Sequence, residues 1–248
     1  GTLTNTVEDS ALILEVISGK DEKDSTSSSK FVENYSEIPT PEKKKIAVLK
    51  DCFDREGLDS EVKVRIEQTI EKLKEKGHEI ENISFPELDF LVPTYYVLST
   101  AEASSNLARF DGVHYGYRTE SPLDMEETYV KSRTEGFGEE VKRRIMLGTF
   151  VLSAGYHDAY YKKAQQVRRL VQNKTEKILM DFDFILSPTT PHTAFDIGNK
   201  HTDPTAMYLE DIFTVQANLS GNPAISLPLA NHSNGMPIGL HIMANHFK

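Results

Sequence analysis

The spacing of apolar residues along the chain predicts helices that alternate with short strands. The clearest helix lies between an Asp59 cap and a Gly77 stop, with its apolar positions at helical spacing. Residues 46–49 form a short apolar run before it, and residues 78–85 alternate between apolar and polar after it. This order predicts a β-α-β unit with two parallel strands. Because no glycine-rich turn follows residues 46–49, we interpret the unit as scaffold and not as a nucleotide site.

Further helices and strands are predicted on both sides of this unit. One helix starts with a capping box at Thr6 and ends at Gly19. A long helix covers residues 159–179, and its charged positions predict a solvated face, with RNA binding as the less favoured alternative. Two further helices are predicted to meet near residues 154–155, and another covers residues 207–219 after Asp203 and Pro204. Strands are predicted over residues 184–187, 224–228 and 238–244, and a turn at residues 233–235 joins the last two. This mixture predicts an α/β fold with a mixed β-sheet core covered by helices.

Composition narrows the classes of protein and of site. The 248 residues are 38% hydrophobic, which is enough for a sizeable core, and the net charge of −10 argues against a broad surface for nucleic acid. The histidines lack metal-ligand spacing, so we expect no metal site. The single cysteine, Cys52, cannot form an internal disulfide, which favours a cytoplasmic protein. No apolar run approaches the ~20 residues of a membrane span, and no signal-peptide pattern is found.

Residues 20–45 are polar, contain two prolines and lack periodicity, so they predict a surface connector. The chain starts at Gly1 without a methionine and enters a helix signal almost at once, and it ends in the strand-like residues 238–244. Both ends therefore look cut from a longer protein. We expect residues 1–248 to form a single partial domain, with the connector inside it.

Residues 95–118 mix small, polar and aromatic side chains in a way that core packing does not require. A surface helix would instead show one apolar stripe and one charged face. The stretch therefore predicts the wall of a binding site. No Gly-x-Ser-x-Gly elbow and no glycine- and serine-rich nucleophile loop occurs in the sequence.

Two arginines and one aspartate are candidates for charge recognition. Arg143 and Arg144 occupy adjacent helix positions about 100° apart, so only one of them can face inward. Asp211, on the predicted helix over residues 207–219, is flanked by apolar residues and needs a cationic partner. Two interpretations stay open on this evidence. Arg144 and Asp211 form a structural ion pair, or they bind the carboxylate and ammonium groups of a small zwitterion.

Six segments carry motifs that periodicity does not explain: residues 1–9 (GTLTNTVED), 99–112 (STAEASSNLARFDG), 135–145 (EGFGEEVKRRI), 155–164 (GYHDAYYKKA), 187–191 (SPTTP) and 217–226 (ANLSGNPAIS). Together they resemble the amidase signature family, and within it the glutaminase subunits, or A subunits, of the tRNA-dependent amidotransferases. The resemblance runs essentially from end to end. It implies an amidase-signature-like domain that is present in part, as the C-terminal portion that follows the catalytic serines.

The resemblance implies a glutaminase that supplies ammonia from glutamine, so that Glu-tRNA(Gln) is converted to Gln-tRNA(Gln) for translation. Such enzymes are carbon–nitrogen ligases with glutamine as the nitrogen donor. In the family a lysine and two serines form the acyl-enzyme, and they lie upstream of the matched segments. We therefore expect no catalytic residue in this chain and no activity from it alone. The implied partners are the B and C subunits of a heterotrimer, with ATP and Mg²⁺ used by the B subunit, tRNA reached through it, and no cofactor or membrane contact for this chain.

The resemblance also assigns three substrate-binding residues. It implies that Arg144 binds the α-carboxylate of glutamine, that Asp211 binds its α-ammonium group, and that Tyr95 forms a hydrogen bond with the substrate. Two opposite charges at one end would orient the amide toward a nucleophile. The alternatives are a different amidase-signature hydrolase and a non-catalytic scaffold fragment that binds partner subunits. The charged pair favours an amino-acid substrate, because an aryl or fatty amidase would line that end with apolar groups.

Overall fold

The computed structural model describes residues 1–37, 43–198 and 204–247, with the side chains of residues 204–206 left undescribed. The chain forms two compact units, Gly1–Glu42 and Lys43–Lys248, and each is described by itself. The boundary between them falls within the predicted connector over residues 20–45, of which 38–42 lie outside the described residues. The single partial domain stays a prediction.

The first unit contains the helix α1, Val7–Ile17, and the short 3₁₀ helix η1, Tyr35–Glu37. The predicted cap is confirmed, because the Thr6 hydroxyl accepts a hydrogen bond of 3.0 Å from the Asp9 amide. The helix ends at Ser18, before Gly19, whose φ of +130° suits a glycine. No residue of α1 is buried.

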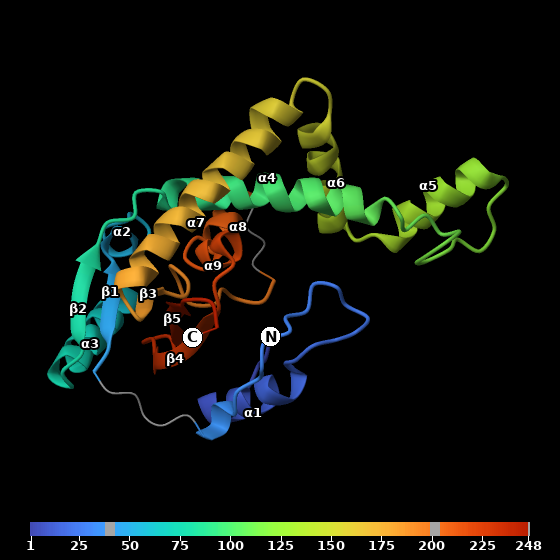
Figure 1. The fold of residues 1–248 in the computed structure, drawn as a ribbon. Helices are drawn as coiled ribbons and strands as arrows, with labels where there is room; N and C mark the ends of the chain where they lie inside the picture. The colour runs from blue at the N-terminus through green and yellow to red at the C-terminus, as the bar shows by residue number, and fades with distance from the viewer. Residues whose placement is uncertain (38–42, 199–203, 248) are drawn as a thin grey trace. The chain divides into compact units, whose positions relative to one another are not determined.

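The second unit is built on a five-stranded mixed sheet with the order β2-β1-β3-β5-β4 (Figure 1). The strands are β1 Lys45–Leu49, β2 Glu79–Ile83, β3 Phe184–Pro188, β4 Ala224–Asn231 and β5 Pro237–Ala244. Strand β1 pairs in parallel with β2 and β3, whereas β5 runs antiparallel to both β3 and β4. The predicted α/β class with a mixed sheet is therefore confirmed.

The predicted β-α-β unit is also confirmed. After β1, the short helix α2, Lys50–Phe53, leads to α3, Ser60–Glu75. The carboxylate of Asp59 caps α3 by accepting from the amides of Glu61 at 2.8 Å and Val62 at 3.0 Å. Buried Ile66 anchors the helix in the core, and Gly77, with a φ of +91°, permits the turn into β2.

Further long helices belong to the second unit (Figure 1). They are α4 Leu88–Leu107, α5 Met125–Gly136, α6 Glu139–Leu152 and α7 Lys163–Asp181, the last preceded by the π-helical segment η2, His157–Lys162. Helices α4 and α6 are in close contact at Gly148, where an added Cβ would overlap the carbonyl oxygen of Thr100. This contact fixes the position of α6 against α4. Within the described residues, none of the helices combines the length and apolar character needed to cross a bilayer.

The prediction that the charged residues of the long helix α7 form a solvated face is wrong at two positions. The Nε atom of Arg168 donates to the carbonyl oxygen of Leu219 at 3.1 Å, and the ammonium group of Lys174 binds the Glu87 carboxylate at 2.6 Å. Both basic side chains are half-buried. Periodicity placed them away from the apolar stripe, but neighbouring elements cover that side of α7 as well.

The single helix predicted over residues 207–219 is also wrong. The chain forms two short helices, α8 Pro204–Leu209 and α9 Val215–Ser220, and Asp211 lies in the turn between them (Figure 1). The amides of Asp211 and Ile212 donate hydrogen bonds to carbonyls three residues earlier. This is the tighter 3₁₀-type pattern, in place of the α-helical pattern of four residues. This turn buries Ile212 and Phe213 while Asp211 stays exposed. Asp203 lies outside the described residues.

Candidate functional site

Arg144 of α6, Tyr96 of α4 and Asp211 of the α8–α9 turn form one cluster. The Tyr96 hydroxyl donates to Oδ2 of Asp211 at 3.5 Å, and the Arg144 guanidinium lies over the Tyr96 ring, 5.6 Å from its centroid. Among the described residues, no ion pair within 4.0 Å joins Arg144 to Asp211. The structural ion pair considered from the sequence is therefore not formed, and Tyr96 contacts both charged residues.

Glu140 and Tyr208 complete this cluster. Oε1 of Glu140 accepts hydrogen bonds from Nε of Arg144 at 3.1 Å and from the Tyr208 hydroxyl at 3.3 Å. The Tyr208 ring stacks on Tyr96, with 4.0 Å between the ring centroids. Arg143 binds the other oxygen of Glu140 and is the more exposed arginine, with 51% of its side chain accessible against 34% for Arg144. The expectation that only one of the two arginines faces inward is confirmed.

Burial and neighbouring charges set the protonation of the cluster. Partial burial, together with the negative charge of Asp211, raises the pKa of Tyr96 to about 12. Burial is the largest single influence on the pKa of Arg144 and acts to lower it, but the hydrogen bond and charge of Glu140 together with the neighbouring Tyr96 and Tyr95 outweigh it, so the net shift of this pKa is upward. At neutral pH the cluster therefore presents a fixed cation and a phenol that donates a hydrogen bond.

The structure places Tyr95 beside this cluster and not between its charges. Its ring meets that of Tyr96 edge-on at a centroid distance of 5.3 Å, and it lines a small cavity next to α7 and α9. Sequence reasoning missed Tyr96, Tyr208 and Glu140. The spacing of Glu140 and Arg144, four residues apart on a helix, was a readable signal for that pair. No pattern in the sequence pointed to Tyr208.

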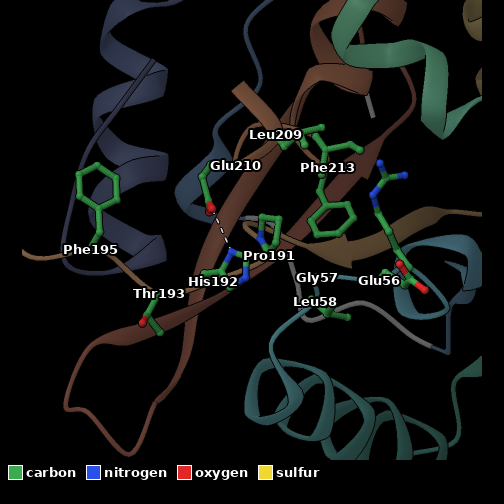
Figure 2. Close-up of a pocket in the computed structure, with 12 residues that line it drawn as sticks. Glu56, Gly57, Leu58, Pro191, His192, Thr193, Phe195, Leu209, Glu210 and Phe213 are labelled. Carbon is green, nitrogen blue, oxygen red and sulfur yellow. Dashed lines mark hydrogen bonds and ion pairs between the residues drawn. The ribbon is translucent and has the colours of Figure 1, made fainter. Parts of the chain in front are cut away.

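A larger pocket of about 450 Å³ lies on the other side of the α8–α9 turn (Figure 2). It lies where the loop between α2 and α3 meets the loop that follows β3. Its lining is mainly apolar, with Leu58, Pro191 and Phe213 among the residues labelled in Figure 2. Nδ1 of His192 and Oε1 of Glu210 are 2.9 Å apart at its edge. Glu210 thus borders this pocket, whereas the next residue, Asp211, contacts Tyr96.

The donor set of the cluster suits an organic zwitterion. An arginine binds a carboxylate with paired hydrogen bonds, and an exposed carboxylate binds an ammonium group. In the described part of the chain, no group of three or more His, Cys, Asp or Glu side chains is arranged to hold a metal ion. The chemistry that these residues offer is therefore recognition by charge and hydrogen bonding.

Comparisons with known proteins all place this chain among the amidases. The family model described as "Amidase" matches residues 1–248. Over its whole length the chain is 50% identical to the A subunit of glutamyl-tRNA(Gln) amidotransferase from Clostridium botulinum (strain Loch Maree), of which it covers 51%. It is 51% identical to the subunit of the same name from Oceanobacillus iheyensis, again covering 51%. The chain thus spans about half the length of the curated relatives it matches.

Solved structures agree with this result. The crystal structure of the A subunit of glutamyl-tRNA(Gln) amidotransferase from Thermotoga maritima superposes with a TM-score of 0.73 at 38% identity, covering 98% of this chain and 48% of that one. A 6-aminohexanoate cyclic dimer hydrolase superposes with a TM-score of 0.72 at 20% identity, covering 98% of this chain and 50% of that one. The second similarity concerns the fold alone.

Proposed function

The chain belongs to the amidase family, and on this premise we propose that it is the substrate-binding half of a glutaminase subunit that supplies ammonia for converting Glu-tRNA(Gln) to Gln-tRNA(Gln). Identities of about 50% over the whole chain to subunits named for that activity support the proposal. So does the 38% identity to the Thermotoga subunit of known structure.

The observation that carries the proposal is that Arg144 and Asp211 both contact Tyr96 without pairing with each other. An α-amino acid brings a carboxylate and an ammonium group on one carbon, and this cluster offers a basic and an acidic side chain around one phenol. Arg144 would bind the α-carboxylate and Asp211 the α-ammonium group. Fixing that end would direct the side-chain amide toward a nucleophile, and positioning of this kind is worth ~7–11 kcal/mol of barrier in favourable cases. Tyr95 remains the family-based proposal for a substrate hydrogen bond.

The acylation chemistry itself is proposed to lie outside this chain. In the family it uses a lysine and two serines from a glycine- and serine-rich segment, and no such segment occurs in the sequence. The proposed partners are the B and C subunits of a heterotrimer. The B subunit would use ATP and Mg²⁺ and would bring the tRNA, so this chain would hold glutamine and no cofactor.

A second candidate function is that of an amidase-signature hydrolase acting on another amide. Hydrolases with this fold match the chain at about 20% identity, which speaks for the fold alone. The two opposite charges at Arg144 and Asp211 favour an amino-acid substrate over an aryl or fatty amide. A third candidate, a non-catalytic scaffold fragment, shares the expectation that the chain alone is inactive.

Glutamine titration of the purified chain tests the proposal. We expect Asp211→Asn to weaken glutamine binding about tenfold or more, as for loss of a charge-assisted hydrogen bond, with little change in thermal unfolding. Glu210→Gln is the matched control, because the adjacent carboxylate borders the other pocket and contacts His192. Equal binding by the two variants would contradict the assignment of Asp211.

An ammonia assay tests the placement of the chemistry. We expect the purified chain to release no ammonia from glutamine, because it lacks the family's nucleophiles. Ammonia release that Arg144→Ala abolishes would show that this chain carries a nucleophile of its own.

A further inference from the structure

Tyr208 lies near the end of α8, three residues before Asp211. Its backbone carbonyl accepts a hydrogen bond of 3.3 Å from the Asp211 amide, so the two residues belong to one tight turn of the chain. After Asp211, the buried side chains of Ile212 and Phe213 fix this segment to the hydrophobic core. Before Asp211, the side chain of Tyr208 fixes it to the cluster.

The Tyr208 side chain contacts both of the helices that carry the rest of the cluster. Its hydroxyl donates to Oε1 of Glu140 on α6 at 3.3 Å, and its ring stacks on Tyr96 of α4 with the centroids 4.0 Å apart. Glu140 also accepts from Arg144, and the Arg144 guanidinium lies over the Tyr96 ring. These contacts form a closed ring of four side chains from three helices, and loss of Tyr208 opens it.

This ring links the two charges that the proposed function assigns to the substrate. Arg144 is a member of the ring, whereas Asp211 is joined to it through the backbone of Tyr208 and through the Tyr96 hydroxyl at 3.5 Å. Binding groups work only when they are held within about 0.5 Å of the productive geometry. If Tyr208 is lost, Arg144 keeps its hydrogen bond to Glu140, but the position of Asp211 relative to Arg144 is no longer fixed from this side.

We propose that Tyr208 is a positioning residue, which holds Asp211 at the separation from Arg144 that an α-amino acid requires. The role rests on the proposed function, because it takes Arg144 and Asp211 as the partners of the substrate. Tyr208 acts through Asp211 and contributes no charge of its own. It therefore determines how much the ammonium group of the substrate adds to binding, while the carboxylate still meets Arg144.

Titrations of the purified chain with L-glutamine and with glutaramate, which is glutamine without its α-ammonium group, test this role. The wild type should prefer glutamine about tenfold or more, the effect of a hydrogen bond to a charged group. Tyr208→Leu removes the ring and the hydroxyl, so it should lose most of this preference and still bind glutaramate. Tyr208→Phe keeps the ring and should show a smaller loss. Tyr161→Leu is the control, because this half-buried tyrosine contacts Gln165 outside the cluster.

The Asp211→Asn background shows whether Tyr208 acts through Asp211. There the ammonium group has already lost its partner, so adding Tyr208→Leu should cause little further loss of glutamine affinity. A further loss as large as in the wild type would overturn the positioning role. So would a full preference for glutamine in Tyr208→Leu or, should that variant fail to fold, in Tyr208→Phe, and the proposed function would then still stand. A wild type without any preference for glutamine would contradict the proposed function, and the role of Tyr208 with it.

Discussion

Nε of Arg144 donates a hydrogen bond of 3.1 Å to Oε1 of Glu140, one turn earlier on α6. The same carboxylate oxygen accepts from the Tyr208 hydroxyl at 3.3 Å, so a single acidic residue holds a cation from α6 and an aromatic residue from α8. Tyr208 in turn stacks on Tyr96. A ligand therefore meets an Arg144 guanidinium whose orientation is already restricted, which lowers the entropy lost on binding.

Glu140→Gln is predicted to weaken glutamine binding more than it weakens the fold. Ion pairs between residues four apart on a helix contribute about 0.3–0.5 kcal/mol to stability, so urea unfolding should change little. Glutamine affinity should fall about tenfold, which corresponds to about 1.4 kcal/mol, because the guanidinium loses the group that orients it. Calorimetric titration measures the affinity.

The control for this prediction is Glu139→Gln. Glu139 pairs with Lys142 at 2.6 Å on the exposed side of the same helix, with 87% of its side chain accessible. This variant removes one negative charge at the adjacent position without touching Arg144. A comparable loss of affinity in both variants would mean that net charge, and not the orientation of Arg144, controls binding.

Gly148→Ala is predicted to destabilise the chain through the contact between α4 and α6. The new Cβ would overlap the Thr100 carbonyl oxygen and lie 2.6 Å from its carbon, and these are backbone atoms that can move only with the helix. Overpacking of this kind costs about 1–3 kcal/mol, so the urea midpoint should drop. Gly138→Ala at the α6 N-cap, with no heavy atom within 4 Å of the new Cβ, should cost less than about 1 kcal/mol.

Stability is predicted to fall in mild acid because of His241. This residue is buried in β5 with Nδ1 3.3 Å from the Ser187 hydroxyl, and burial lowers its pKa below the ordinary 6.5. The unfolded chain therefore binds a proton at a higher pH than the folded chain. Stability is fully present above about pH 6.5 and declines as the pH falls toward the folded pKa, by at most about 1.4 kcal/mol per pH unit.

Urea unfolding of the wild type and of His241→Gln between pH 5 and 8 checks this prediction. The variant should lose the part of the pH slope that lies below about pH 6.5, because glutamine does not titrate. His157→Gln, which changes an exposed histidine, provides the control. An unchanged slope in His241→Gln would show that other groups set the acid sensitivity.

Much of the fold was predictable because its signals are local. The Asp59 and Thr6 caps, the Gly77 stop and the Asn234–Gly235 turn each act through hydrogen bonds and dihedral angles within a few residues. The packing of helix α4 could not be predicted from such local signals. It packs against α6, α7 and α9, and a helix with contacts on several sides shows no single apolar stripe. The sequence did not show the break between α8 and α9, because this break depends on the burial of Ile212 and Phe213 in the folded protein.

The site was predictable in its charges and not in its contacts. Arg144 and Asp211 come from α6 and from a turn far along the chain, and the sequence identified both as charges that needed partners. The partner of Asp211 is the Tyr96 hydroxyl, and adjacent tyrosines differ only in the direction that α4 gives them. Which of the two tyrosines faces Asp211 depends on how α4 packs against its neighbours, and no spacing within residues 95–118 reveals that packing.

Tyr96→Phe is predicted to weaken glutamine binding, because it removes the hydroxyl that contacts Asp211 while keeping the ring between Tyr208 and Arg144. Hydrogen bonds to charged groups contribute about 1.5–3 kcal/mol, so affinity should fall about tenfold or more, with the unfolding temperature nearly unchanged. Tyr95→Phe is the matched comparison, since it removes the hydroxyl of the adjacent tyrosine. If Tyr95→Phe weakens glutamine binding and Tyr96→Phe does not, the substrate contact belongs to Tyr95, and the contact of the Tyr96 hydroxyl with Asp211 does not contribute to binding.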